Sequence, residues 1–483
     1  MFFFLDLILY VAILQLFFKM KHKMLTKTYN QIIIYIRNMQ NGGMSMLLEF
    51  KFGNYKSFRE INSFQMISAP KQKGLDYSVY KKKIDKKTVG VLCSSVIYGA
   101  NASGKTNIIG AMDVLRSIIL RGHIRNTEEP VISPNTATYV LELIPNSKLK
   151  TAEPVVFEIS FLDKNRKIDY HLSLDLGTFL SGKYERKIVS EELYVDNKMI
   201  FLRNNGIKYG FLNRYIPDVS SKNLDSLKAV ADNSLEPTEL FLTNGFKNIF
   251  SPTLAKQVID WFDKKFMVIY RADSIKLIKR FVDSQKSSMY VEQTTNEAAK
   301  MFGVVSNDLG YFVSDKDSDA SLYSIMENGS KLNTLIPAEI FESYGTIRFV
   351  NVFPLVISAL QTGATLIVDE FDASIHPMAL MSIINIFHND DINKNHAQLI
   401  FNTHNPIFLN SNLFRRDEIK FVERSDDTGY SEIYALSDFG TSTEKGVRKH
   451  EDYMKNYFVC KYGAIKDIDF SPLFENMNGE QEV

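Results

Sequence analysis

The sequence predicts an α/β fold, and three observations support this prediction. First, "VGVLCSSVIYGA" at residues 89–100 is an almost continuous apolar run, typical of a strand buried in a parallel sheet. Second, a helical pattern follows from Lys105, with one apolar face formed by Ile108, Met112, Leu115 and Ile119. Third, another apolar run at residues 364–368 ends in two acidic residues. Buried strands that alternate with helices predict a sheet covered by helices.

A phosphate-binding loop joins the first of these strands to its helix. The stretch "GANASGKTN" contains Gly99, four residues and then Gly104-Lys105-Thr106, which is the pattern GxxxxGK[ST]. In this pattern backbone N–H groups and the helix N-terminus bind phosphate oxygens, the lysine bridges the terminal phosphates, and the threonine hydroxyl holds Mg²⁺. We therefore expect a nucleotide to contact Gly99, Asn101, Ala102, Ser103, Gly104, Lys105, Thr106 and Asn107.

The second buried strand, in "GATLIVDEFDASIHP", supplies two carboxylates. Asp369 at its end is placed to orient Mg²⁺ through water, so we expect the metal at Thr106 and Asp369. Glu370, one residue further on, is placed to polarise an attacking water as general base. An acidic helix cap before Pro377 is the structural alternative, and the phosphate loop upstream favours the nucleotide site.

A third apolar strand, "AQLIFNT", ends just before His404. A histidine at a strand end is usually a solvated turn residue. Here it follows the acidic strand by one helix, where a residue that senses the γ-phosphate belongs. We therefore expect Glu370 and His404 to be the catalytic residues.

Much more chain separates Lys105 from Asp369 than a compact GTPase needs. This spacing favours an ABC-type ATPase head, in which a signature loop of one subunit closes over the ATP of the other. The candidate loop is "ESYGTIRF": Ser343 offers a hydroxyl, Gly345 permits close backbone approach, and a helix starting near Thr346 directs its dipole at the phosphate. A plain helix cap is the structural alternative. The expected fold class is thus a P-loop NTPase, an ABC-type ATPase head with an antiparallel β insert and a helical insert, to which the resemblance below adds the SMC-like heads. The expected cofactors are ATP and Mg²⁺.

The inserts are predicted from a change of period. "VVFEISF" and "YHLSLDL" alternate on either side of a turn at residues 163–165, and "ELYVDNKMIFL" is a second hairpin. Ser251-Pro252 is a cap and first residue for a helix. Asn, Asp, Ser and Gly accumulate over residues 305–337, which predicts loops.

The first 45 residues differ in composition from the rest. "MFFFLDLILYVAILQLFF" is almost entirely apolar and precedes a lysine-rich stretch, so it can be a short membrane anchor or an amphipathic segment. A third interpretation is a translated leader, because the codons of Gly42-Gly43 can form a ribosome site ahead of Met44 or Met46. We favour this mis-assigned start, with a folded protein that begins at "MLLEFKFGNYKSF".

Together these patterns divide the chain into six segments. They are 1–45, an N-terminal extension outside the folded protein; 46–137, an N-terminal ATPase lobe with the phosphate loop; 138–220, the antiparallel β insert; 221–340, the helical insert; 341–440, a C-terminal ATPase lobe with the signature loop, the acidic strand and His404; and 441–483, a C-terminal tail.

Charge and cysteine content narrow the protein class. The 57 lysines and arginines nearly balance the 56 aspartates and glutamates, so the net charge does not indicate a nucleic-acid or membrane partner. A local basic patch would not show in the net charge, so nucleic-acid binding stays open. Cys93 and Cys460 lie far apart without metal-ligand spacing, which suits a reducing cytoplasm.

These motifs resemble a known family. "GANASGKTN", "ESYGTIRF", "VDEFDASIHP", "NTHNP" and "LFRRDEIKFVE" occur in the order seen in AAA-type ATP/GTP phosphatases of the abortive-infection and anti-phage group, which are ABC- and SMC-like heads without long coiled coils. The resemblance spans about 46 to 470 and implies an ATP-driven homodimer in the cytoplasm, away from the membrane. It also implies a sensor or switch in phage defence that works with a neighbouring RloB-like nuclease or toxin. Ala102 replaces the glycine common in SMC-type loops, and S-Y-G-T replaces L-S-G-G-Q, which disfavours transport.

Three other protein classes share some of these features. The apolar N-terminus alone suggests a transporter subunit, which the long insertion and the signature oppose. An OLD-type nuclease would need a further catalytic domain, for which the stretch after His404 is too short. A DNA-repair or chromosome-associated SMC-like head shares the same motifs, so the sequence leaves this alternative open.

Overall fold

The computed structural model describes residues 44–70, 72, 74–84, 87–125, 141–179, 184–211, 221–270, 288–290, 293–301, 303–313, 320–328, 332–441, 446–448, 451–466, 469–472 and 474. The chain forms two compact units, 1–44 and 45–483, and the elements below belong to the second. The interpretations of the N-terminal extension fall on residues 1–43 and lie outside the described residues. Ser45 belongs to the fold, since its Oγ accepts a hydrogen bond from Trp261 Nε1 at 2.9 Å.

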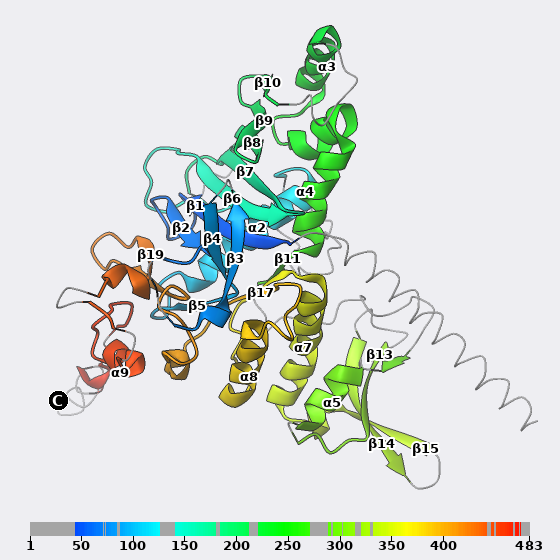
Figure 1. The fold of residues 1–483 in the computed structure, drawn as a ribbon, viewed down its shortest axis with the longest axis vertical. Coiled ribbons are helices and arrows are strands. Elements are labelled where there is room, and N and C mark those ends of the chain that lie inside the picture. Colours follow the sequence, from blue (N-terminus) through cyan, green and yellow to red (C-terminus); the bar gives the residue numbers. More distant parts are fainter. Residues whose placement is uncertain are drawn as a thin grey trace, which may run out of the picture. The chain divides into compact units, whose positions relative to one another are not determined.

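A six-stranded sheet forms the centre of the fold (Figure 1). Its order is β11 (Phe266–Ile269), β16 (Thr365–Val368), β17 (Gln398–Asn402), β5 (Ser94–Tyr98), β18 (Ile419–Arg424) and β19 (Ser431–Ala435). The first five strands are parallel and β19 is antiparallel to β18. Every residue of β5, β11, β16 and β17 is buried, which explains why these strands are nearly continuous apolar runs in the sequence.

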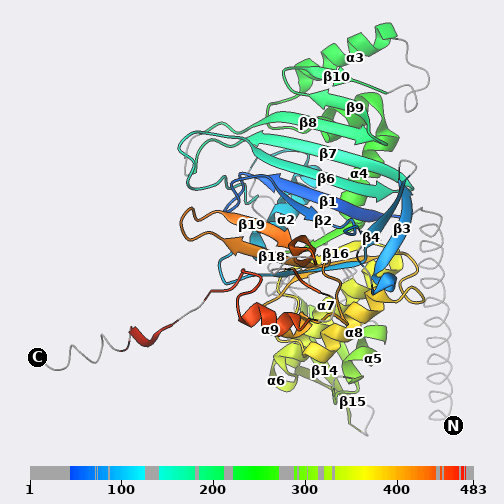
Figure 2. The same cartoon turned by 60° about the vertical axis from the view of Figure 1, so that its left-hand side comes forward.

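Helices and a second sheet cover the two faces of this sheet. Alternate strand residues such as Ile97, Ile367 and Ile400 pack in a core with α2 (Lys105–Arg121) and α4 (Pro252–Lys264). Their neighbours, including Val96, Leu366 and Leu399, pack in a second core with α7 (Tyr344–Thr362) and α8 (Pro377–His388), which lie side by side in Figures 1 and 2. Because successive residues of a strand point to opposite faces, each strand of the sheet contributes side chains to both cores.

A seven-stranded antiparallel sheet packs on the α2 side (Figure 2). Its order is β10 (Ile207–Tyr209), β9 (Lys198–Arg203), β8 (Lys187–Val195), β7 (Arg166–Asp175), β6 (Val155–Asp163), β1 (Met46–Gly53) and β2 (Asn62–Gln65). Both predicted hairpins are present, with positive φ at Lys164 and Asn165 in one turn and at Asp196 and Asn197 in the other. Because β6 pairs with β1, these strands extend a sheet that the N-terminal strands begin.

The segment 221–340 differs from the expected helical insert. It contains α3 (Ser221–Ser234), a π-helix (Leu242–Phe250), α4 and α5 (Gln293–Met301), but also β11 of the central sheet. It also contains a four-stranded antiparallel sheet of β12 (Ser288–Tyr290), β13 (Asp308–Val313), β14 (Ala320–Asn328) and β15 (Leu332–Pro337). The prediction of loops over 305–337 is therefore wrong. Polar residues such as Asp308 and Asn328 lie at the ends of these strands rather than in one long loop.

The remaining elements are short. They are β3 (Val79–Ile84), β4 (Lys87–Leu92), α6 (Ala338–Phe341), α9 (Tyr453–Phe458) and the 3₁₀ turns Asp76–Ser78, Pro406–Phe408 and Leu436–Phe439. Among the described residues, no helix has both the length and the apolar character to cross a membrane.

Glu191 on β8 is a buried carboxylate that fixes the start of the π-helix. It accepts hydrogen bonds from the backbone N–H groups of Phe241 and Leu242 at 2.6 and 2.8 Å, and from the Tyr170 hydroxyl at 2.9 Å. We expect Glu191→Ala to lower the free energy of unfolding by about 2–4 kcal/mol, because three buried donors lose their acceptor. Calorimetry should show a lower Tm for Glu191→Ala than for Glu191→Gln, which keeps one acceptor oxygen. An unchanged Tm in both variants would contradict this role.

Candidate functional site

The candidate site lies where three parallel strands end side by side. Val368 of β16 is in register with Phe401 of β17, and Asn402 is in register with Ile97 of β5. The residues that follow each strand therefore emerge at one edge of the sheet. This edge brings together the phosphate loop after β5, the acidic pair after β16 and the histidine after β17.

Two glycines let the phosphate loop follow its path. A Cβ on Gly99 would lie 2.4 Å from the carbonyl oxygen of Val422, which no side chain permits. Gly104 has φ 116, in the region that favours glycine, and a Cβ there would lie 2.9 Å from Ser57 Oγ. The helix α2 begins at the next residue, so its N-terminal N–H groups face the loop.

Ala102 adopts the same left-handed conformation as a glycine would, with φ 61. Such a conformation costs an alanine about 1–2 kcal/mol. Ala102 and Asn101 are exposed, and both border a cavity of about 340 Å³. The outer half of the loop is thus open to an approaching molecule. Asn107, on the helix side, donates to Ser57 Oγ at 2.9 Å.

Lys105 is almost completely buried within the loop. Its Nζ donates to the carbonyl oxygens of Gly99 and Ala100 at 2.8 and 3.0 Å. Burial lowers the pKa of Lys105 to about 8, and the carboxylates of Glu370 and Asp369 oppose that shift. At neutral pH the ammonium is therefore still charged and lies between the phosphate loop and the acidic pair.

Thr106 and Asp369 meet across the site. The Thr106 hydroxyl donates to Asp369 Oδ1 at 3.1 Å, and the Asp369 side chain is buried. A hydroxyl and a carboxylate are the hard oxygen ligands that Mg²⁺ prefers. Within the described part of the chain, the nearby Ser103 Oγ is buried without a hydrogen-bond partner. These observations fit a magnesium–nucleotide complex, in which Thr106 and Asp369 would hold the metal and the metal would neutralise phosphate charge.

Glu370 is exposed, in contrast to its buried neighbour Asp369. It has φ 49, a left-handed conformation that a glutamate adopts only when its surroundings hold it. Its carbonyl oxygen accepts from Arg348 Nη2 at 2.6 Å, and its N–H donates to Asn402 Oδ1. The backbone of Glu370 is thus fixed from both sides, while its carboxylate faces solvent beside Lys105.

His404 shares this environment. Partial desolvation and then the Lys105 ammonium lower the pKa of His404, against the opposing carboxylates of Glu370 and Asp372. Its imidazole is therefore neutral at physiological pH and can donate a hydrogen bond without adding charge. The preceding Thr403 is buried, and its hydroxyl donates to Asp372 Oδ2 at 2.7 Å, which fixes the turn.

The signature loop does not reach the phosphate loop of its own chain through any described contact. Ser343 Oγ accepts from Thr346 N at 3.1 Å, so Ser343 caps α7, which begins at Tyr344 rather than near Thr346. A Cβ on Gly345 would lie 2.2 Å from Ser374 O, so contact within the chain already requires this glycine. The exposed side chains of Ser343 and Tyr344 stay available to another molecule.

Two residues of this site had no role in the sequence analysis. Arg348 is buried in α7 and reaches the Glu370 carbonyl, and Asn402 is buried at the end of β17. Each was visible as a polar residue inside an apolar run, but its partner becomes clear only from the fold.

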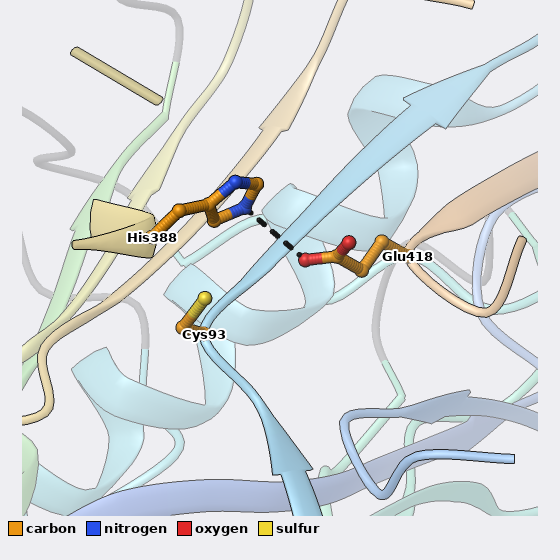
Figure 3. Close-up of side chains that lie close together, drawn as sticks. All are labelled: Cys93, His388 and Glu418. Atoms are coloured by element: carbon orange, nitrogen blue, oxygen red, sulfur yellow. Dashed lines mark ion pairs between the residues drawn. The ribbon is translucent and has the colours of Figure 1, made fainter. Parts of the chain in front are cut away.

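A separate buried group contains Cys93, His388 and Glu418 (Figure 3). The atoms that could bind a metal, the Cys93 Sγ, a ring nitrogen of His388 and a carboxylate oxygen of Glu418, lie within 4.8 Å of one another. The sequence spacing gave no sign of it. His388 Nε2 lies 3.3 Å from Glu418 Oε1, and both contact Ser94 Oγ, at 2.9 and 2.8 Å.

This group is better explained as a hydrogen-bonded cluster than as a metal centre. Glu418 Oε2 already accepts from Ser78 Oγ and from Arg415 N. His388 Nδ1 has no partner among the described residues, whereas a histidine that binds metal through Nε2 donates its other N–H to an acceptor. Burial also keeps the pKa of the Cys93 thiol well above its usual range, so the thiol stays protonated.

Comparison with known proteins decides the family. The family model described as "AAA domain, putative AbiEii toxin, Type IV TA system" matches residues 94–410. The chain belongs to this family. The match begins at β5 and ends after His404, so it contains the phosphate loop, Ser343, Asp369, Glu370 and His404. By family and fold, this chain is therefore a P-loop AAA domain.

Solved structures of SMC heads are similar to this chain at low identity. An SMC head bound to the C-terminal winged-helix domain of ScpA is 13% identical, with TM-score 0.36 over 80% of this chain and 97% of that chain. The SMC head domain from Thermotoga maritima is 13% identical, with TM-score 0.33 over 80% and 98%. An SMC head from Pyrococcus furiosus bound to the C-terminal domain of ScpA is 12% identical, with TM-score 0.34 over 81% and 96%. No curated protein matches the sequence.

The lowered pKa of Lys105 predicts a pH dependence of nucleotide binding. As the pH rises through about 8, the free protein loses the ammonium charge that would face the phosphates, so ATP affinity should fall. Lys105→Arg keeps its charge over this range and should show a flatter profile, whatever its affinity at neutral pH. Fluorescence titration with a labelled ATP across this pH range tests the expectation. Equal pH dependence in the two proteins would contradict it.

Proposed function

We propose that this protein binds and hydrolyses Mg²⁺–ATP between two copies of the chain and acts as a switch in anti-phage defence. One observation carries the enzymatic part. The side chains that follow the ends of β5, β16 and β17 lie together at one sheet edge, and they are Lys105, Thr106, Asp369, Glu370 and His404. A charged lysine, a hydroxyl–carboxylate pair, an exposed carboxylate and a neutral imidazole are the groups that phosphoryl transfer to water requires.

Each of these groups has a distinct task in the proposal. The phosphate loop and Lys105 bind the phosphates and stabilise the negative charge that develops on them. Thr106 and Asp369 hold the metal ion. Glu370, exposed beside this buried group, takes a proton from the attacking water. His404, neutral and close to Lys105, donates a hydrogen bond to the terminal phosphate.

Two features support a composite site formed by two copies. The outer half of the phosphate loop, at Asn101 and Ala102, is exposed beside a cavity. Ser343 and Tyr344 are also exposed, at the N-terminus of the 19-residue helix α7. A helix N-terminus favours a phosphate, and a second copy in the opposite orientation would bring Ser343 to the ATP of the first. Such an interface is isologous, so two sites would form together.

The family description supports the biological part of the proposal. It refers to an AbiEii toxin and a type IV toxin–antitoxin system, which suits a cytoplasmic ATPase that controls a toxin or nuclease, including an RloB-like one. The seven-stranded sheet gives less support to a DNA-repair head. Lys51 pairs with Glu49 and Glu158 at 3.4 and 3.7 Å, and Lys167 pairs with Asp169 at 2.9 Å. These two paired lysines are therefore not free to contact a DNA backbone.

Removal of the proposed base should separate binding from turnover. We expect Glu370→Gln to bind ATP as the wild type does and to hydrolyse it about 10²–10⁴-fold more slowly, because the carboxylate no longer accepts the proton. Lys105→Ala should instead weaken ATP binding itself. Steady-state hydrolysis and equilibrium binding distinguish the two variants. Full hydrolytic activity in Glu370→Gln would rule out the assignment of the base.

Mixing two inactive variants tests whether Ser343 acts on the partner's ATP. Lys105→Ala damages the site in its own chain, whereas Ser343→Arg would damage the site of the partner. Their mixed dimer holds one composite site with both defects and one with neither, so ATP hydrolysis should partly return.

The matched control mixes Lys105→Ala with Glu370→Gln. Both residues belong to the same half-site, so each composite site in that mixed dimer keeps one defect and no activity should return. If the first mixture also restores nothing while each variant still dimerises with wild type, Ser343 is only a helix cap.

A further inference from the structure

Asn402 contacts both acidic residues of the proposed site through one side chain. Its Nδ2 donates to Asp369 Oδ1 at 2.6 Å, and its Oδ1 accepts from the Glu370 backbone N–H. The residue is 1% exposed, so neither contact is exchanged readily with water. Asp369 Oδ1 also accepts from the Thr106 hydroxyl, which places Asn402 one hydrogen bond from the proposed metal-binding hydroxyl.

The position of Asn402 is fixed by the sheet. It is the last residue of β17, and its backbone is in register with Ile97 of β5, the strand that leads to the phosphate loop. Phe401, the residue before Asn402 on β17, is in register with Val368, the last residue of β16. The amide therefore stands on a rigid, buried frame between the phosphate loop and the acidic pair.

Both contacts restrain groups that could otherwise move. The Asn402 amide restrains the orientation of the Asp369 carboxylate in addition to the Thr106 hydroxyl. The left-handed backbone of Glu370 is unfavourable for a residue with a side chain and needs a partner that holds its N–H in place. Because the amide is planar and rigid, it fixes the Asp369 carboxylate and the Glu370 backbone relative to each other.

We propose that Asn402 is a positioning residue for the divalent cation and the attacking water, a role that rests on the function proposed above. It touches neither nucleotide nor metal. It sets the orientation of the Asp369 carboxylate that would bind the cation, and it holds the turn from which the Glu370 carboxylate projects. Loss of the Asn402 amide therefore weakens cation binding and turnover, while binding of the nucleotide by the phosphate loop is retained.

The test measures cation affinity apart from catalysis. Mn²⁺ replaces Mg²⁺, and electron paramagnetic resonance follows its binding to the full chain in complex with a non-hydrolysable ATP analogue. We expect Asn402→Ala to weaken Mn²⁺ binding by about 10–100-fold, as is typical when a group that orients a metal ligand is removed. Affinity for the analogue without divalent cation should stay at the wild-type value. In hydrolysis assays kcat should fall, and a higher Mg²⁺ concentration should be needed for half-maximal rate.

Two further variants separate positioning from folding. Asn402→Leu keeps the number and branching of the side-chain heavy atoms without polar groups, so it replaces Asn402→Ala if the smaller side chain leaves a destabilising cavity. Asn393 is the matched control, since it is also fully buried and bonds to Phe387 O and Ala397 O, each at 2.9 Å, away from the site. Asn393→Ala should lower the Tm and leave Mn²⁺ affinity unchanged.

Wild-type Mn²⁺ affinity in both Asn402 variants, or an equal loss in Asn393→Ala, would overturn the proposal. If the wild type hydrolyses no nucleotide, the proposed enzymatic function fails, and Mn²⁺ binding still decides the role of Asn402.

Discussion

The parallel pairing of β5, β17 and β16 is the constraint on which the rest of the site depends. Because all three strands point the same way and their ends are in register, the groups that follow them emerge at one edge. The phosphate loop, the acidic pair and His404 are far apart in the chain and belong to one site only through this pairing. The two cores that cover the faces of the sheet stabilise the pairing, since every residue of these strands is buried.

A well-supported sheet can hold an unfavourable backbone at its edge. Ala102 and Glu370 both adopt left-handed conformations, and Gly99 and Gly104 sit where a side chain would collide with neighbouring atoms. Such strain persists only where the surrounding structure holds it, and at Glu370 hydrogen bonds with the buried Arg348 and Asn402 do so. The strain has a chemical use under the proposed function. The turn at Glu370 exposes that carboxylate while the adjacent Asp369 stays buried.

The same contacts connect α7 to the sheet edge that carries the proposed site. Arg348 of α7 donates to the Glu370 carbonyl, and the glycine at 345 permits close contact with the Ser374 carbonyl in the loop that follows. A displacement of α7 would therefore act directly on the backbone of Glu370. If a second copy binds ATP through the start of α7, as proposed, dimerisation would act on hydrolysis through these contacts. The hydrogen bond from Arg348 and the close packing at Gly345 would transmit the displacement to Glu370.

The sequence by itself determined the local features: the phosphate loop, the buried strands, both hairpins of the large sheet and the helix cap at Ser251. These depend on short-range periodicity, turn chemistry and the backbone freedom of glycine, which act over a few residues. Tertiary structure decided the pairings between distant segments. It placed β11 in the central sheet, formed strands where polar residues predicted loops, and joined Asn402 to Asp369 and Arg348 to Glu370. These contacts depend on strand order and burial, and a polar residue in an apolar run shows only that it needs a partner, not which one.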